Sequence, residues 1–165
     1  MPNRVFVIAD THFGHKKACS FESKTRPFSS VEEMNEEMVY RWNHVVKPHD
    51  LVWHLGDVLF GEHSFEILAR LNGVKKLVLG NHDRYPMQKY LEYFSQVCSS
   101  VRLRECIFTH IPVHPAQFHR YRANIHGHLH SHTLDDPRYI NVSCEQSNLA
   151  PQLLDTIMLK VPVAR

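Results

Sequence analysis

The sequence lacks the features that mark several protein classes. No apolar run approaches the roughly 20 residues that a membrane-spanning helix requires. The four cysteines are widely spaced and form no Cys-x-x-Cys pair, which argues against a structural zinc site and a redox dithiol. No repeat, low-complexity tract or linker rich in Pro, Gly or Ser divides the chain. We therefore expect one domain over residues 1–165.

Charge of one sign is not in excess either. The formal net charge is +2, so charge alone predicts neither a nucleic-acid nor a membrane partner. The first apolar stretch, Val5 to Ala9, is too short for the core of a signal peptide, so we expect a cytoplasmic protein with reduced thiols. Histidine is the residue in excess, at 14 of 165, and no tag-like run of histidines explains the number.

Five polar motifs each follow a short run of apolar, β-branched residues. They are Asp10-Thr11-His12, Gly56-Asp57, Gly80-Asn81-His82-Asp83, His110 and Gly127-His128-Leu129-His130. Such runs are typical of β-strands, so each motif is expected where a strand ends and a loop begins. In open α/β sheets ligands bind beyond the carboxyl ends of the strands, and we expect the motifs to converge there.

The remaining periodicities outline an α/β fold. Apolar residues three or four apart predict a helix from Val31 to Val46, with a capping box at Ser29 and Ser30. Shorter helices are expected around 65–71 and after Pro86. Further strands are predicted at 97–103, 107–109, around Ile125, at 139–142 and at 156–161. Alternating strands and helices followed by a strand-rich half indicate two stacked sheets covered by helices.

The motifs supply seven potential metal ligands, with carboxylate, imidazole and amide donors. They are Asp10, His12, Asp57, Asn81, His110, His128 and His130. This mixed set suits Mn, Fe, Zn, Co or Ni, whereas an all-oxygen set would indicate Mg or Ca. Seven ligands exceed the needs of one ion but fit two ions that share a carboxylate. Two metals roughly 3.5–4 Å apart can clamp a phosphate and activate a bridging hydroxide for in-line attack.

In composition and order the motifs resemble those of the calcineurin-like metallophosphoesterase superfamily, over residues 10–130. The resemblance implies a four-layer αββα sandwich, with two stacked mixed β-sheets flanked by helices. It also implies two metal sites that share one bridging carboxylate. One site would consist of Asp10, His12 and His130, the other of Asn81, His110 and His128, and Asp57 would bridge them.

The same resemblance implies a catalytic pair. His82 would contact the phosphate and act as general acid toward the leaving group, while Asp83 would orient its ring. Physical reasoning agrees, since a histidine next to a ligating asparagine lies near a bound phosphate, and a carboxylate can fix its tautomer and raise its pKa. Alternatively, His82 only satisfies a hydrogen bond within its loop.

Departures from larger relatives narrow the expected reaction. The arginines that clamp phosphate in protein serine/threonine phosphatases are missing, because Val58 to Gly61 follows Gly56-Asp57 and Leu79 precedes Gly80. The chain is too short for the DNA-binding cap of Mre11-like nucleases. It looks like the compact microbial or phage phosphoesterases, and we expect a phosphodiesterase acting on small phosphodiesters or nucleotides, with Mn as the preferred metal. The alternatives are a nuclease acting on DNA or RNA and a non-catalytic metal-binding scaffold.

Several further residues are candidates for substrate contact. His15 and Lys16 follow the first ligands and Arg84 follows the third motif, so each is placed to meet a phosphate or to lie on a solvated loop. His54, just before Gly56, either orients a ligand or is a core histidine. The basic, aromatic run 119–122 fits base stacking and phosphate pairing, although such runs are more often solvated faces. A small phosphoester is favoured over nucleic acid, no membrane partner is expected, and the sequence does not predict the oligomeric state.

Overall fold

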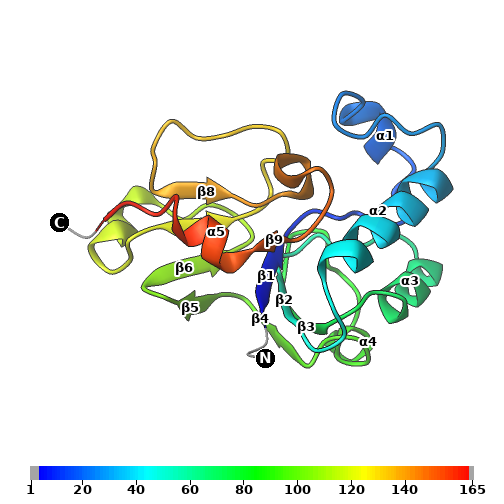
Figure 1. Ribbon diagram of the computed structural model, residues 1–165, viewed down its shortest axis with the longest axis horizontal. Coiled ribbons are helices and arrows are strands. Elements are labelled where there is room, and N and C mark those ends of the chain that lie inside the picture. Colours follow the sequence, from blue (N-terminus) through cyan, green and yellow to red (C-terminus); the bar gives the residue numbers. More distant parts are fainter. Residues whose placement is uncertain (1–3, 164–165) are drawn as a thin grey trace.

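Two mixed β-sheets lie face to face at the centre of the molecule (Figure 1), in a computed structural model that describes residues 4–163. The first sheet has the strand order β4-β3-β2-β1-β9 and the second β5-β6-β7-β8. The strands of the first sheet are β1 (Val5–Ile8), β2 (Leu51–His54), β3 (Val74–Val78), β4 (Gln96–Cys98) and β9 (Gln152–Leu153). Those of the second are β5 (Val101–Leu103), β6 (Cys106–Thr109), β7 (Asn124–His126) and β8 (Tyr139–Asn141).

Helices cover the outer face of the first sheet. They are α2 (Val31–Val45), α3 (Phe65–Ala69) and α4 (Met87–Leu91), with the 3-10 helix η1 (Glu62–Ser64) leading into α3, while the short helix α1 (Ala18–Phe21) lies next to α2 (Figure 1). On the second sheet Phe118 of the short 3-10 helix η2 (Pro115–His119) packs on Tyr139 of β8, with ring centroids 5.0 Å apart. The expected two stacked mixed sheets flanked by helices are confirmed.

Strand β1 shows why the sheets stack. Side chains alternate along β1 and the residue after it: Phe6 and Ile8 join the core beneath the helices, whereas Val7 and Ala9 join the core between the two sheets. Trp53 and Phe108, from β2 and β6, belong to that second core. Because the strand is buried on both faces, its sequence is a continuous apolar run and not an alternation of apolar and polar residues.

Helix α2 begins as the sequence predicts. Ser30 is the N-cap and its hydroxyl accepts the backbone N–H of Glu33 at 3.0 Å, while the Glu33 carboxylate accepts the backbone N–H of Ser29 at 2.8 Å. The buried side of the helix includes Met34, Met38 and Trp42, which confirms the expected core stripe.

Two predicted strands are wrong. Residues 156–161 lie in and after helix α5 (Leu154–Met158), because Leu154, Ile157 and Val161 are buried at spacings of three and four, as in a helix. The predicted strand 97–103 is two strands, β4 and β5, that belong to different sheets and are separated by two serines. No helix among residues 4–163 is long and apolar enough to cross a membrane.

The two sheets join at the end of β1. The backbone N–H of Ala9 donates to the Val142 carbonyl at 3.0 Å, and the N–H of Cys144 donates to the Ala9 carbonyl at 2.9 Å. Strands β1 to β3 run parallel in one sheet and β6 to β8 run parallel in the other. The loops that follow these strands therefore lie together, at the edge where the two sheets join.

The N-cap of α2 is expected to stabilise the folded protein. Ser30→Ala removes an acceptor for a backbone N–H and should lower the free energy of unfolding by about 1 kcal/mol in urea titration. Ser29→Ala is the matched control and should cost at most a few tenths, because only its backbone takes part in the cap. Equal losses for the two variants would contradict the assigned cap.

Candidate metal centre

The seven predicted ligands lie in the loops that follow five strands, and the structure brings them together. Six of the seven form two groups, and within each group the ligand atoms all lie within 4.8 Å of one another: Asp10, His12 and His130 in one, and Asp57, His110 and His128 in the other. The Asn81 amide oxygen lies 2.9 Å from His110 Nε2, which places it with the second group. Each group combines carboxylate and imidazole donors, a set that suits a transition metal.

Asp57 lies between the two groups. Its Oδ2 is 3.8 Å from His12 Nε2 and 3.3 Å from His110 Nε2. Glycines allow this approach, because a side chain at Gly80 would overlap the Asp57 carboxylate. A carboxylate that faces imidazoles of both groups is in the position of a bridging ligand.

The backbone is strained at the ligands. Positive φ angles occur at Asp10 (59°), His12 (49°), Asp57 (55°), His128 (71°) and His130 (52°). A non-glycine residue in this region costs roughly 1–3 kcal/mol and persists only where the surroundings hold it. Hydrogen bonds between the loops do so: the N–H groups of Asp10 and His12 donate to the carbonyls of Gly56 and Asp57 at 2.9 and 3.1 Å.

Three buried ligand atoms lack a hydrogen-bond partner among the described residues. They are Oδ1 of Asp10 and both ring nitrogens of His12. Buried polar atoms are nearly always satisfied, and each one left alone costs free energy. A cation within the first group would satisfy Asp10 Oδ1 and one His12 nitrogen, so the residues fit a metal there.

In several predicted ligands, the side-chain atom that would not bind the metal lies within hydrogen-bond distance of another residue. His110 Nδ1 lies 2.7 Å from the Leu55 carbonyl and His130 Nδ1 lies 3.0 Å from Glu145 Oε1, so Nε2 of each ring remains for a metal. Likewise, Asp10 Oδ2 accepts hydrogen bonds from Ser143 Oγ at 2.8 Å and from the His128 N–H at 2.9 Å. These contacts orient the ligands before any ion binds.

Burial and mutual charge shift the pKa values of the ligands. Burial raises the pKa of Asp10 to about 6. Burial alone would also raise that of Asp57, but the hydrogen bond and charge of His110 outweigh it and lower the pKa to about 2. Burial lowers the pKa of His12 well below its usual range, so this ring is neutral at physiological pH and able to bind a metal.

His82 lies beside this centre and is exposed. Its backbone N–H donates to Asp57 Oδ1 at 2.8 Å, and its ring centroid is 5.9 Å from that of His12. The ring also lines a small cleft of about 220 Å³ together with Phe60, Arg84 and Tyr85. His82 is therefore anchored through its backbone, while its side chain is free to meet a ligand.

Asp83 has a different role from the one expected. Its Oδ2 accepts the backbone N–H groups of Asp57 and Gly80, both at 2.8 Å, and its Oδ1 accepts the N–H of Val58 at 3.0 Å. Among the described residues it makes no hydrogen bond to the His82 ring. The prediction that Asp83 orients that ring is wrong; the carboxylate joins the loops that carry Asp57 and Asn81.

Comparison with known proteins agrees with this geometry. Residues 3–157 match the sequence profile of calcineurin-like phosphoesterases. The chain belongs to that family. It is 32% identical over 167 residues to an uncharacterized protein of Methanocaldococcus jannaschii, a match that covers 94% of this chain and 89% of that protein. It is 26% identical over 181 residues to the gene 66 protein of Mycobacterium phage D29, covering 87% and 88% of the two chains.

A solved structure shares the fold of this calcineurin-like chain. The crystal structure of a protein of unknown function from Aquifex aeolicus superposes with a TM-score of 0.79 at 23% identity. The superposition covers 96% of this chain and 100% of that one. At this identity the likeness concerns the fold alone.

The predicted substrate-contact residues of this calcineurin-like site lie at unequal distances from the ligands. His15 stacks on Phe60 with ring centroids 4.0 Å apart and is 5.6 Å from the His12 ring, so it borders the first group. Arg84 Nε donates to the Asn81 carbonyl at 3.1 Å and the residue shares the cleft with His82. Lys16 is exposed and makes no hydrogen bond or ion pair with residues 4–163.

His54 belongs to the buried framework of the centre. Its Nε2 lies 2.9 Å from Thr11 Oγ1 and its Nδ1 accepts the Gly56 N–H at 3.2 Å. Burial lowers its pKa to about 3, so the ring is neutral. His54 thus connects the first two ligand loops as a core histidine.

Sequence reasoning missed a buried ion pair behind the first ligand group. Arg26 is fully buried and donates to the carbonyls of Asp10 and Thr11 and to Glu145 Oε1. The same Glu145 oxygen faces His130 Nδ1. In the sequence Arg26 lies in a polar stretch that looks solvated, and its partner is 119 residues away, so no local signal marks the pair.

Replacing Arg26 should lower the free energy of unfolding. Arg26→Met leaves Glu145 buried without its cation and two carbonyls unpaired, and we expect a loss of about 3–5 kcal/mol in the free energy of unfolding. Urea denaturation of the metal-free protein measures it. Arg70→Met is the matched control, because Arg70 forms an exposed pair with Glu36 and should cost about 1 kcal/mol or less. Similar losses for both variants would show that the buried pair is not a structural requirement.

Proposed function

We propose that this chain is a dinuclear metal-dependent phosphohydrolase that prefers small phosphodiesters or nucleotides. The observation that carries the proposal is the position of Asp57 between two carboxylate–imidazole groups. Asp10, His12 and His130 would hold one ion, and Asn81, His110 and His128 the other. Two divalent ions bound there would polarise the phosphoryl group and lower the pKa of water, and manganese suits the mixed nitrogen and oxygen donors.

His82 is the proposed proton donor. Its ring is exposed beside the ligand groups, and its backbone is fixed on Asp57 Oδ1. An exposed imidazole with no competing hydrogen bond among the described residues is available to protonate the leaving oxygen of a phosphoester. This step matters most for a diester, whose alkoxide leaving group is a strong base.

The preference for diesters follows from the cations around the site. Arg26 is buried and fully engaged by carbonyls and Glu145, so it is not available to substrate. Arg84 is exposed in the cleft that His82 lines. A dianionic monoester gains more from a cluster of arginines than a monoanionic diester does, and the described site offers no such cluster. We also propose a cytoplasmic location, which suits the four free cysteines.

Hydrolysis of bis-p-nitrophenyl phosphate and p-nitrophenyl phosphate tests the proposal. Protein stripped with a chelator and reloaded with Mn²⁺ should turn over the diester faster. His82→Ala should lower kcat by about 10²–10⁴-fold, the usual contribution of a general acid, without loss of bound metal. His49→Ala, which changes an exposed histidine outside the site, should keep full activity.

Faster turnover of the monoester would contradict the diester preference but keep the hydrolase. Metal-loaded protein that hydrolyses neither compound would contradict the proposed activity on simple phosphoesters. Full activity in His82→Ala would remove that residue from the mechanism.

A further inference from the structure

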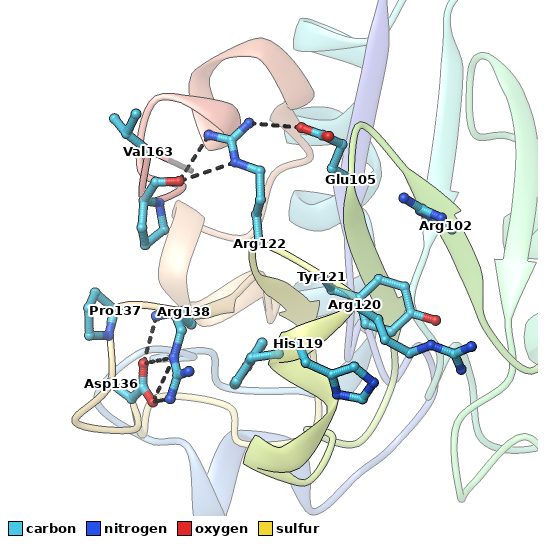
Figure 2. Close-up of a pocket in the computed structure, with 12 residues that line it drawn as sticks. Arg102, Glu105, His119, Arg120, Tyr121, Arg122, Asp136, Pro137, Arg138 and Val163 are labelled. Atoms are coloured by element: carbon cyan, nitrogen blue, oxygen red, sulfur yellow. Dashed lines mark hydrogen bonds and ion pairs between the residues drawn. The ribbon is translucent and has the colours of Figure 1, made fainter. Parts of the chain in front are cut away.

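A second cleft lies away from the candidate metal centre. It has a volume of about 690 Å³ and shares no lining residue with the two ligand groups. Its walls come from β5, from η2 and the segment that follows it, from the segment that precedes β8 and from the segment after α5 (Figure 2). Arg122 precedes β7 whereas His128 follows it, so the cleft and the metal centre lie at opposite ends of that strand.

The cleft is rich in arginine, and the arginines fall into two kinds. Arg138 forms a two-pronged pair with Asp136, and Arg122 donates to the Pro162 carbonyl and faces Glu105 at 3.5 Å. By contrast, the side chains of Arg102 and Arg120 are exposed and make no ion pair or hydrogen bond with residues 4–163. Their positive charges are uncompensated, which favours an anion at this place.

An aromatic ring accompanies these two arginines. Arg102, Arg120 and Tyr121 all line the cleft (Figure 2), and the Arg102 guanidinium carbon lies 6.0 Å from the Tyr121 ring centroid. Phe118 is already occupied, because Arg138 covers it at 4.3 Å and its ring packs edge-on against Tyr139. Tyr121 is therefore the aromatic residue of the cleft that accompanies the unpaired cations: Arg102 lies near its ring and Arg120 precedes it in the chain.

We propose that this cleft binds single-stranded nucleic acid, with a base stacked on Tyr121 and the adjoining phosphates held by Arg102 and Arg120. A planar guanidinium matches the geometry of a phosphate, and alternation of cations with an aromatic ring is how proteins bind single strands without reading their sequence. A volume of about 690 Å³ is sufficient for a nucleotide unit. An acidic peptide would use the arginines but gain little from the tyrosine.

Fluorescence anisotropy of a fluorescein-labelled oligothymidylate tests the inference on the metal-loaded protein. A denaturing gel afterwards checks that the oligonucleotide is intact. Tyr121→Leu should weaken binding by roughly 5- to 150-fold, whereas Tyr121→Phe should bind like wild type because it keeps the stacking face. Arg102→Ala and Arg120→Ala should each reduce the slope of log K against log salt by roughly 0.7, the value for one phosphate contact to a single strand.

Two control variants distinguish a specific effect of the cleft residues from the general effect of losing a positive charge or an aromatic ring. Arg70→Ala removes an exposed arginine elsewhere, and Tyr40→Ala removes a tyrosine that is 65% exposed on α2; neither should change affinity. Thermal melting confirms that each variant is folded. The inference is overturned if the cleft variants bind like these controls, or if poly-glutamate of equal charge competes as well as unlabelled oligothymidylate. Because the assay measures binding, its outcome is independent of whether the metal centre hydrolyses phosphoesters.

Discussion

The rest of the candidate site depends on the contacts that the Asp57 carboxylate makes. It faces imidazoles of both ligand groups, and it holds the loop after β3 through the backbone of His82. Its own loop is fixed by Asp83, which accepts N–H groups from both loops. One acidic residue thus organises the ends of β2, β3 and β6, and a second one, Asp83, holds it in place.

The two cores explain how such a polar centre is tolerated. Apolar residues fill the space between helices and sheet and the space between the two sheets, whereas the predicted metal ligands gather where the sheets meet beyond Ala9. Strained backbone at five ligands and unsatisfied atoms on Asp10 and His12 are held there by the packed strands. Apolar burial in the two cores offsets the unfavourable free energy of this strained backbone and of these unsatisfied atoms.

The sequence predicted the parts of the molecule that depend on local pattern. Helix α2 and its Ser30 cap, the strands before each motif and the convergence of the ligands follow from periodicity and from the rule that sites lie beyond strand ends. Residues 156–161 were misjudged because β-branched residues are also compatible with a short buried helix. Arg26 and the role of Asp83 depend on contacts between distant segments, which periodicity does not report.

If Asp57 is shared by two metal sites, binding of both ions depends on it, and calorimetric titration of metal-free protein with Mn²⁺ measures that dependence. Wild-type protein should bind two Mn²⁺ ions per chain with saturation. In Asp57→Asn, whose amide is a poorer shared ligand, both affinities should fall together. Binding of a single ion in the wild type, or loss of one affinity without the other in the variant, would contradict a shared centre.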